Sequence, residues 1–363
     1  MTSVCSLLLI VTLASQCAFA QLTEPTNITW PSVTSSGTCD NSTDDLITSN
    51  SSSDPFSTIL QNTFNFVNST IICKTGCEEA AKIALIEIYY FYGPTETDYE
   101  VVNLNNFRAL LTGGHWNFSR NTTCFFPGYL NDAKTDYTLT VVNAYLSNNS
   151  TNLLVVVWPN RQEYSWMVCQ MPYLAQRLAK AFDDFSTASS GKVTTMVFVG
   201  HSVGAHLCAY TARLLVVLRI PLLAALDPAN PLFSPYPWRC QEGIGASDAE
   251  CVVTLHTDIG RLGTPIAIGP VDCYANGGTY RQPGCTEYDM NPTGCADKFA
   301  CSHTKALLIW CYAVRYPGSI IARRCSSYSA DRSGMCDSSE TIDITSLNSC
   351  RIPGPYYFNT TNI

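Results

Sequence analysis

Apolar residues in this chain form short runs separated by segments with helical spacing. Runs typical of buried strands cover residues 83–91, 123–126, 153–158, 193–199, 222–226 and 252–255. Between two of these runs, Leu174, Leu178 and Phe182 recur at the spacing of one helix face. Alternating strands and helices favour a mostly parallel sheet with helices on both faces. The pattern therefore predicts an α/β fold.

The strand predicted at residues 193–199 leads directly into the motif Gly200-x-Ser202-x-Gly204. Two glycines leave room for a sharp strand-to-helix turn that lifts the serine clear of the sheet. Helical spacing then continues from Val203 to Leu218, so the amides at the helix start favour negative charge beside the serine. We predict that Ser202 is a nucleophile.

A nucleophilic serine needs a carboxylate and a histidine base, which follow it along the chain in that order in α/β-hydrolases. Asp227 ends an apolar strand, where ligand sites of α/β sheets lie, and His303 precedes the helical run 307–314. Taken alone, Asp227 could be an ordinary Asp-Pro turn and His303 an ordinary residue at a helix start. Their order and placement favour a catalytic acid and a catalytic base.

The chain contains four other histidines. His201 and His206 flank Ser202 on a tight turn and point elsewhere, so we interpret both as packing or loop-bracing groups. We expect His256 to be structural and His115 to lie in a surface loop. The His, Cys and carboxylate residues show no spacing typical of a metal site, and we predict neither metal nor cofactor.

Three motifs together resemble the pancreatic-lipase family: Gly-His-Ser202-Val-Gly, Leu-Asp227-Pro-Ala-Asn-Pro and Cys-Ser-His303. The resemblance also covers residues 255–258, 271–278, 282–285 and 354–358. It implies a disulfide-rich α/β-hydrolase whose mostly parallel central sheet is covered by helices on both faces. It also implies that Ser202, Asp227 and His303 hydrolyse esters through an acyl-enzyme.

The resemblance further implies that the backbone amides of Val203 and Tyr129 form the oxyanion hole. The family usually carries His-Gly-aromatic where this chain has Pro127-Gly128-Tyr129. Pro127 therefore removes a side chain that braces this loop, although the donor itself is a backbone group. Losing one such donor costs about 3 to 4 kcal/mol of transition-state stabilisation, so a displaced loop would leave a slow enzyme.

The resemblance pairs Cys285 with Cys301 at the base of a lid formed by residues 286–300. This lid is shorter than the helical lids of triglyceride lipases, and the neighbouring segment 258–270 is also brief. Both features resemble the A1-type phospholipases and galactolipases of the family, which accept a polar head group. The additional Cys295 has no assigned role.

The first 20 residues contain an apolar core followed by Ala18-x-Ala20, which predicts a cleaved signal peptide and a secreted, extracellular protein. Residues 21–58 are rich in Ser, Thr and Asn and predict a glycosylated arm, followed by a lipase domain over 59–363. No other apolar run is long enough to span a membrane. Glycosylation sequons begin at Asn27, Asn41, Asn50, Asn68, Asn117, Asn121, Asn148, Asn149 and Asn359.

Of the 18 cysteines, two lie in the predicted signal, and the even remainder suggests up to eight disulfides in an oxidising compartment. Pairing cannot be read from sequence alone. Short loops favour Cys240–Cys251 and Cys73–Cys77.

The net charge of −8 argues against a nucleic-acid partner, because phosphates require a basic face. We expect mainly apolar contact with a lipid interface. About 60 residues follow His303, too few for the β-sandwich domain of larger family members, so no colipase partner is expected.

Two functions of different class remain. The first is a secreted ester hydrolase acting on phospholipid at the sn-1 position or on neutral glycerides. The second is a non-catalytic lipid-binding or storage protein on a lipase fold. The intact Ser202, Asp227 and His303 favour the enzyme, whereas Pro127 favours the alternative. A peptidase with the same three residues has no further support in the sequence.

Overall fold

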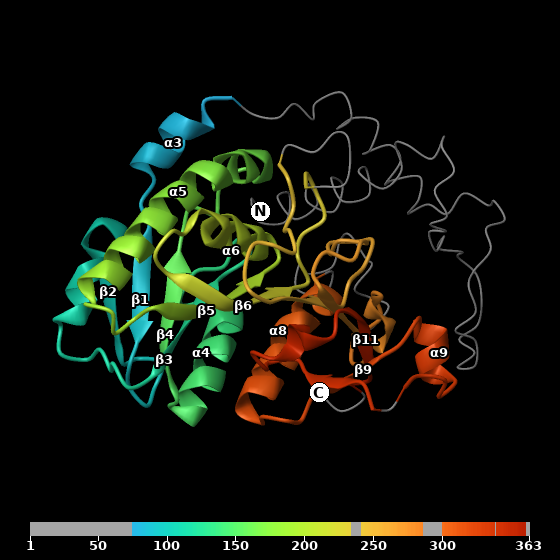
Figure 1. Cartoon of the computed structure of the whole chain (residues 1–363). Coiled ribbons are helices and arrows are strands. Elements are labelled where there is room, and N and C mark those ends of the chain that lie inside the picture. Colours follow the sequence, from blue (N-terminus) through green and yellow to red (C-terminus); the bar gives the residue numbers. More distant parts are fainter. Residues whose placement is uncertain (1–74, 234–240, 286–299, 338, 361–363) are drawn as a thin grey trace.

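A computed structural model describes residues 75–233, 241–285, 300–337 and 339–360. Within them an 11-stranded sheet runs through the molecule in the order β10-β9-β11-β8-β7-β6-β5-β3-β4-β1-β2 (Figure 1). The strands are β1 (Glu87–Phe91), β2 (Tyr99–Asn103), β3 (Asn121–Phe126), β4 (Thr151–Val157), β5 (Thr195–His201), β6 (Arg219–Leu226), β7 (Val252–His256), β8 (Val271–Ala275), β9 (Ile321–Arg324), β10 (Thr341–Asp343) and β11 (Gly354–Phe358).

The centre of the sheet is parallel and its two edges are antiparallel. Strands β4, β3, β5, β6, β7, β8 and β11 pair in parallel. Strands β1 and β2 close one edge in antiparallel fashion, and β9 and β10 close the other. Each of the six apolar runs overlaps one of these strands, β1, β3, β4, β5, β6 or β7. Strand β8 was missed because the buried Asp272 interrupts its apolar run, and β11 because it begins with Gly-Pro.

Helices cover both faces of the sheet, as predicted. Side chains alternate between two cores: Phe126 and Phe198 pack in one with α5 and α6, and Phe125 and Val199 pack in the other with α4 and α8. This architecture is that of an α/β-hydrolase. The helices are α3 (Cys77–Ile83), α4 (Asp136–Asn148), α5 (Tyr164–Ala188), α6 (Val203–Leu214), α8 (Cys301–Arg315) and α9 (Tyr328–Arg332), with 3-10 turns η1 (Leu104–Leu111), η2 (Asn276–Gly278) and η4 (Ser349–Arg351).

Helix α6 ends at Leu214, so the prediction that it extends to Leu218 is wrong. The Asp183 carboxylate on α5 accepts backbone hydrogen bonds from residues 216–218, at 2.8 to 2.9 Å. These bonds hold the chain in a loop that leads into β6, and they override the helical spacing of the apolar residues.

Four disulfides lie within the described residues: Cys77–Cys169, Cys251–Cys350, Cys285–Cys301 and Cys325–Cys336. The predicted pairs Cys240–Cys251 and Cys73–Cys77 are therefore wrong. Cys77 begins α3, which packs on α5, whereas Cys251 adjoins β7 and faces η4. Four buried cysteines remain reduced, so eight bridges is too many; they are Cys124, Cys208, Cys273 and Cys311.

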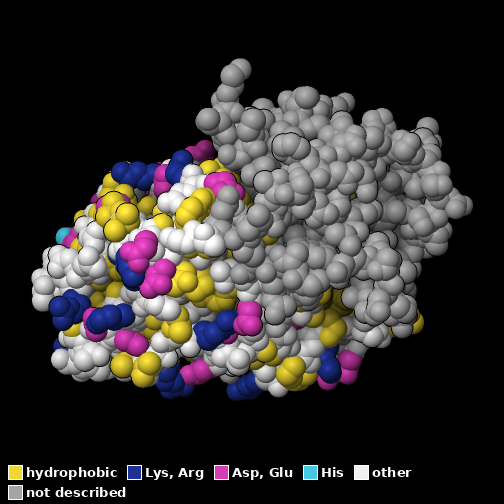
Figure 2. All heavy atoms as spheres, turned by 90° about the horizontal axis from the view of Figure 1, so that it is seen from above, with side chains coloured by type: hydrophobic (Ala, Val, Ile, Leu, Met, Phe, Trp, Pro, Cys, Tyr) yellow, Lys and Arg dark blue, Asp and Glu magenta, His cyan; other side chains and the backbone are white. Residues whose placement is uncertain are grey.

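Several predicted segments lie outside the described residues: the signal peptide 1–20, the arm 21–58, residues 286–299 of the lid, and Cys295. Among the residues that are described, no helix combines the length and apolar character needed to cross a bilayer. On the coloured part of the face in Figure 2, which is the described part of the chain, basic and acidic side chains are interspersed.

Candidate active site

Ser202 occupies a strained turn between β5 and α6. Its backbone angles are φ 57° and ψ −126°, and its amide donates to the carbonyl of Leu226 at 3.0 Å. A methyl group at Gly200 would approach the Cα of Ala205 to 2.5 Å, and one at Gly204 would overlap the carbonyl of Phe126. Both glycines are thus required for the turn that the motif predicts.

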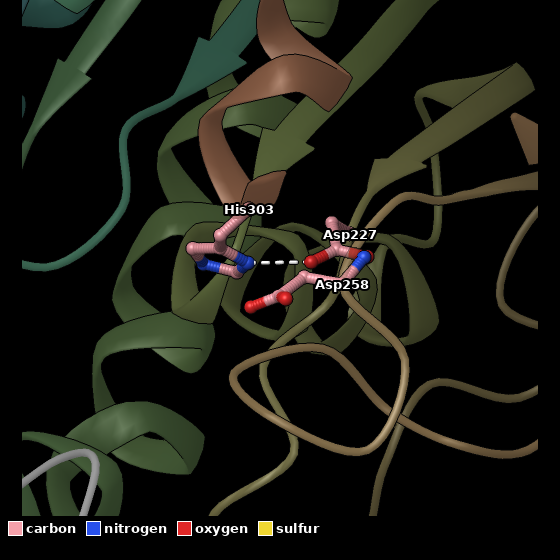
Figure 3. Close-up of side chains that lie close together, drawn as sticks. All are labelled: Asp227, Asp258 and His303. Atoms are coloured by element: carbon pink, nitrogen blue, oxygen red, sulfur yellow. Dashed lines mark hydrogen bonds and ion pairs between the residues drawn. The ribbon is translucent and has the colours of Figure 1, made fainter. Parts of the chain in front are cut away.

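His303 and Asp227 form a buried pair (Figure 3). The Nδ1 atom of His303, in the first turn of α8, lies 2.5 Å from Oδ2 of Asp227, directly after β6. The other oxygen, Oδ1, accepts the amides of Thr257 and Asp258 at 2.8 and 3.0 Å. A carboxylate accepts only, so Nδ1 donates and Nε2 of His303 is left as the basic nitrogen.

A pocket of about 430 Å³ brings Ser202 and His303 to one cavity, a volume that suits a small-molecule site. A polar lining comes from Asn131, Lys134 and Thr135, which lie between β3 and α4, and from Asp136 at the start of α4. An apolar lining comes from other elements: Tyr164, Ala229, Pro231, Leu262 and Leu307. The cavity can therefore hold a molecule with one polar part and one apolar part.

The two histidines beside the nucleophile brace the backbone, as predicted. His201 donates from Nε2 to the carbonyl of His303 at 3.1 Å, and His206 donates to that of Ala229 at 2.7 Å. Burial lowers the pKa of each to about 3, helped at His201 by the nearby His303. Both rings are therefore neutral at physiological pH, and neither replaces His303 as the base.

The remaining histidines lie away from the serine. His256 is fully buried and donates from Nε2 to Asp272 at 2.8 Å, which agrees with a structural role. His115 stacks on Tyr92 with ring centroids 3.8 Å apart, and its side chain is 47% exposed. Its position agrees with a surface loop.

Asp258 is a second buried carboxylate next to Asp227, and sequence reasoning gave it no role (Figure 3). Its Oδ2 accepts the amide of Leu262 at 3.2 Å, while Oδ1 has no hydrogen-bond partner among the described residues. Burial raises the pKa of Asp258 to about 7, against the lowering effect of Arg261. Two sequence signals were available for Asp258: its place just after β7, at the carboxyl end of that strand, and the resemblance over residues 255–258.

Asp227, Asp258 and His303 are also the one group in the described part of the chain whose ligand atoms cluster within 4.8 Å, as a metal site would require. A metal ion there would have to break the hydrogen bond between His303 and Asp227. The arrangement fits proton transfer by His303 better than metal binding.

The two predicted oxyanion donors adjoin the nucleophile. Val203 is the first residue of α6, and Tyr129 follows β3. A methyl group at Gly128 would lie 3.1 Å from Cβ of Ser202, so this loop packs directly on the serine turn.

Pro127 does not leave the oxyanion loop unsupported. The indole of Trp158 donates to the carbonyl of Pro127 at 3.0 Å, and the amide of Asn160 donates to that of Gly128 at 2.7 Å. Both partners come from the carboxyl end of β4. The sequence analysis missed them because nothing in the local pattern joins these two loops.

Cys285 and Cys301 are bonded, as the resemblance implies. Cys301 is the first residue of α8 and stands two positions before His303. The bridge therefore ties the described end of the predicted lid to the helix that carries the candidate base.

The family model and the curated relatives that match this chain all belong to one family, the lipases. A family model described as Lipase matches residues 82–346. Lipase member H of Oryctolagus cuniculus is 29% identical over 229 residues, which is 62% of this chain and 49% of that protein. Pancreatic lipase-related protein 2 of Bos taurus is 25% identical over 255 residues, which is 66% of this chain and 53% of that protein. The chain spans about half the length of the curated relatives it matches.

Among solved structures, a hyperthermophilic esterase from Pyrobaculum calidifontis is 11% identical, with a TM-score of 0.30, over 66% of this chain and 88% of that one. A likeness of that size adds nothing to the argument from the site.

Proposed function

This chain belongs to the lipase family, and we propose on that basis that it hydrolyses carboxylic ester bonds in lipids. Ser202 is the nucleophile, His303 the general base and Asp227 the acid that orients it. The observation that carries this proposal is the 2.5 Å hydrogen bond between His303 and Asp227, beside a pocket that Ser202 also lines.

The reaction follows from these positions. Nε2 of His303 takes the proton of the Ser202 hydroxyl as Oγ attacks the ester carbonyl, and the same proton passes to the leaving alcohol. The resulting acyl-enzyme is hydrolysed by a water activated in the same way. Asp227 stabilises the imidazolium form of His303 at each step. Its own charge is stabilised by the amides of Thr257 and Asp258.

The tetrahedral intermediate places negative charge on the former carbonyl oxygen. We assign its two donors to the amides of Val203 and Tyr129. The assignment of the Val203 amide is supported because Val203 is the first residue of a 12-residue helix, whose N-terminus favours negative charge. The assignment of the Tyr129 amide is supported because the preceding residue, Gly128, packs on Ser202.

The pocket lining favours a phospholipid over a neutral glyceride. Lys134, Asn131 and Thr135 offer donors to a phosphodiester on a wall that also carries the acidic Asp136. The apolar wall formed with Leu262 and Leu307 suits an acyl chain. We therefore propose an A1-type phospholipase acting at the sn-1 ester.

A substitution at Lys134 tests this substrate assignment. Lys134→Ala should lower kcat/KM for phosphatidylcholine about tenfold, as the loss of one charge-assisted hydrogen bond would, and leave tributyrin hydrolysis unchanged. Lys180→Ala is the matched control, because Lys180 is exposed on α5 and pairs with Asp184. Equal effects on both substrates would contradict the assignment.

We also propose that the protein is secreted. The four disulfides require an oxidising compartment, and the predicted signal peptide supplies the route. The mature protein recovered from culture medium should begin at Gln21. A protein retained in the cytosol with Met1 intact would contradict this.

The alternative of a non-catalytic lipid binder was favoured by Pro127. Trp158 and Asn160 supply the support that Pro127 lacks, which removes the main argument for it. A fluorescent organophosphonate ester separates the two functions, because it labels an activated serine covalently. Wild-type labelling that disappears in Ser202→Ala supports the enzyme, and undiminished labelling of that variant would rule out Ser202.

A further inference from the structure

We propose that Asn160 is a positioning residue that orients the Tyr129 amide of the oxyanion hole, an inference that rests on the proposed esterase function. Asn160 belongs to no motif that resembles the family. Its side chain is nevertheless the polar group that fixes the peptide unit containing that donor.

Asn160 is 2% exposed and binds the oxyanion loop at three points. Its Nδ2 donates to the carbonyl of Gly128 at 2.7 Å and to that of Asn131 at 2.5 Å. Its backbone carbonyl accepts the amide of Leu130 at 3.1 Å. One residue at the end of β4 thus holds the whole turn from residue 128 to 131.

The bond to Gly128 determines which way the Tyr129 amide points. The carbonyl of Gly128 and the N–H of Tyr129 belong to one planar trans peptide, so they point in opposite directions. With the carbonyl held on Asn160, the N–H is directed away from Asn160. The same peptide adjoins the nucleophile, since a methyl at Gly128 would lie 3.1 Å from both Cβ of Ser202 and Nδ1 of His201.

A rotated peptide would direct the Gly128 carbonyl where the N–H now points. It would place a partial negative charge in the oxyanion hole and leave the buried Nδ2 of Asn160 with one acceptor fewer. An unmet buried donor costs about 1 to 3 kcal/mol, so Asn160 selects the orientation that catalysis needs. Leu130 has a φ of 64°, a left-handed conformation that is strained for a residue other than glycine. The hydrogen bonds of Asn160 hold the turn in this conformation.

The Asn160 side chain can be changed without losing every contact that holds the oxyanion loop. The backbone bond from Leu130 to residue 160 and the bond from Trp158 to Pro127 do not depend on the Asn160 amide. Asn160→Asp keeps the shape and replaces the donor with an acceptor, which repels the Gly128 carbonyl. Asn160→Ala removes the donor without adding charge, and serves if the Asp variant does not fold.

Asn152→Asp is the matched control. Asn152 lies on β4, the strand that precedes Asn160, is 1% exposed, and donates from Nδ2 to the carbonyl of Asn117 at 2.8 Å, away from the pocket. The Asn152→Asp variant buries a carboxylate, as Asn160→Asp does, but leaves the oxyanion loop unchanged. Any loss of activity caused by lower stability alone should appear in this variant too.

The experiment measures kcat, KM and inhibition by a boronic acid, which forms a tetrahedral adduct with an active serine, after circular dichroism has shown each variant to be folded. Asn160→Asp should lower kcat about 10² to 10³-fold, as the loss of one oxyanion donor does, with KM within twofold. Asn160→Ala should lower kcat at least tenfold, and boronate affinity should fall with kcat in both. Asn152→Asp should change neither.

Wild-type kcat in either folded Asn160 variant would overturn the positioning role, as would a loss no larger than that of Asn152→Asp. The proposed function fails separately: if Ser202→Ala keeps its activity, the esterase assignment is wrong whatever Asn160 does. If Ser202→Ala is inactive and Asn160→Asp is not impaired, only the role of Asn160 is wrong.

Discussion

Among the described residues, two buried histidine–aspartate pairs lie at neighbouring strands, and one of them lines the pocket that Ser202 also lines. His303 bonds to Asp227 at 2.5 Å and lines the pocket with Ser202. His256 bonds to Asp272 at 2.8 Å and is fully buried. A carboxylate that orients an imidazole is therefore not by itself a sign of catalysis. The serine and the open cavity make the difference.

The surroundings of the two pairs show what the second one does. His256 stacks on Tyr274 with ring centroids 4.7 Å apart. Asp272 also accepts the amide of Ile268 at 3.0 Å, so this pair fastens the loop after β7 to β8. That loop contains Asp258 and supplies the amides that hold Asp227. The buried pair thus supports the proposed catalytic pair, His303 and Asp227, through the backbone.

The largest effect that separates the pairs is expected from Asp227→Asn. The new amide presents an N–H to His303 and forces the wrong tautomer on the ring, so kcat should fall about 10⁴-fold with the fold retained. Hydrolysis of p-nitrophenyl butyrate measures this directly. A loss below tenfold would mean that Asp227 does not orient the base.

Asp272→Asn should produce the opposite result. It breaks the buried bond to His256, so the free energy of unfolding should fall by about 1 to 3 kcal/mol, measured by urea titration. At a temperature where the variant is folded, its kcat should stay within twofold of wild type. A catalytic loss comparable with that of Asp227→Asn would remove the distinction between the two pairs.

A smaller, pH-dependent effect is expected at Asp258. Burial raises the pKa of Asp258 from its ordinary value of 3.8 to about 7 in the folded chain, so the folded state binds more protons between about pH 4 and 7. Stability contributed by this group is therefore lost as pH rises through that window. Asn has no proton to lose, so Asp258→Asn should raise Tm at pH 8 by at least about 2 °C.

Calorimetry at two pH values checks this sign. The same substitution should shift Tm much less at pH 4, where Asp258 is protonated in the folded state and still partly protonated in the unfolded state. Equal shifts at pH 4 and pH 8 would show that Asp258 does not titrate as its burial requires.

Local sequence signals were sufficient for part of this picture. The two glycines around Ser202 encode a turn that tolerates no side chain. The strand that ends just before Asp227 places a carboxylate at the edge where ligand sites of parallel sheets lie. These features depend on a few adjacent residues. The apolar runs likewise predicted six strands, because each is continuous along the chain.

Features that depend on contacts between distant segments could not be read in the same way. Asn160 and Gly128 are 32 residues apart and meet only because β3 and β4 are neighbours in the sheet. Cys251 pairs across 99 residues rather than with a nearby cysteine. The buried state of Asp258, which sets its pKa, likewise arises from packing of separate loops.

The most direct test of the central claim is release of fatty acid from dispersed phosphatidylcholine and from a medium-chain triglyceride by the purified secreted protein, with Ser202→Ala beside it. Release from phospholipid that exceeds release from triglyceride, and that falls by about 10⁶-fold in Ser202→Ala, is the predicted result. A folded wild-type protein that binds both lipids and cleaves neither would contradict the account.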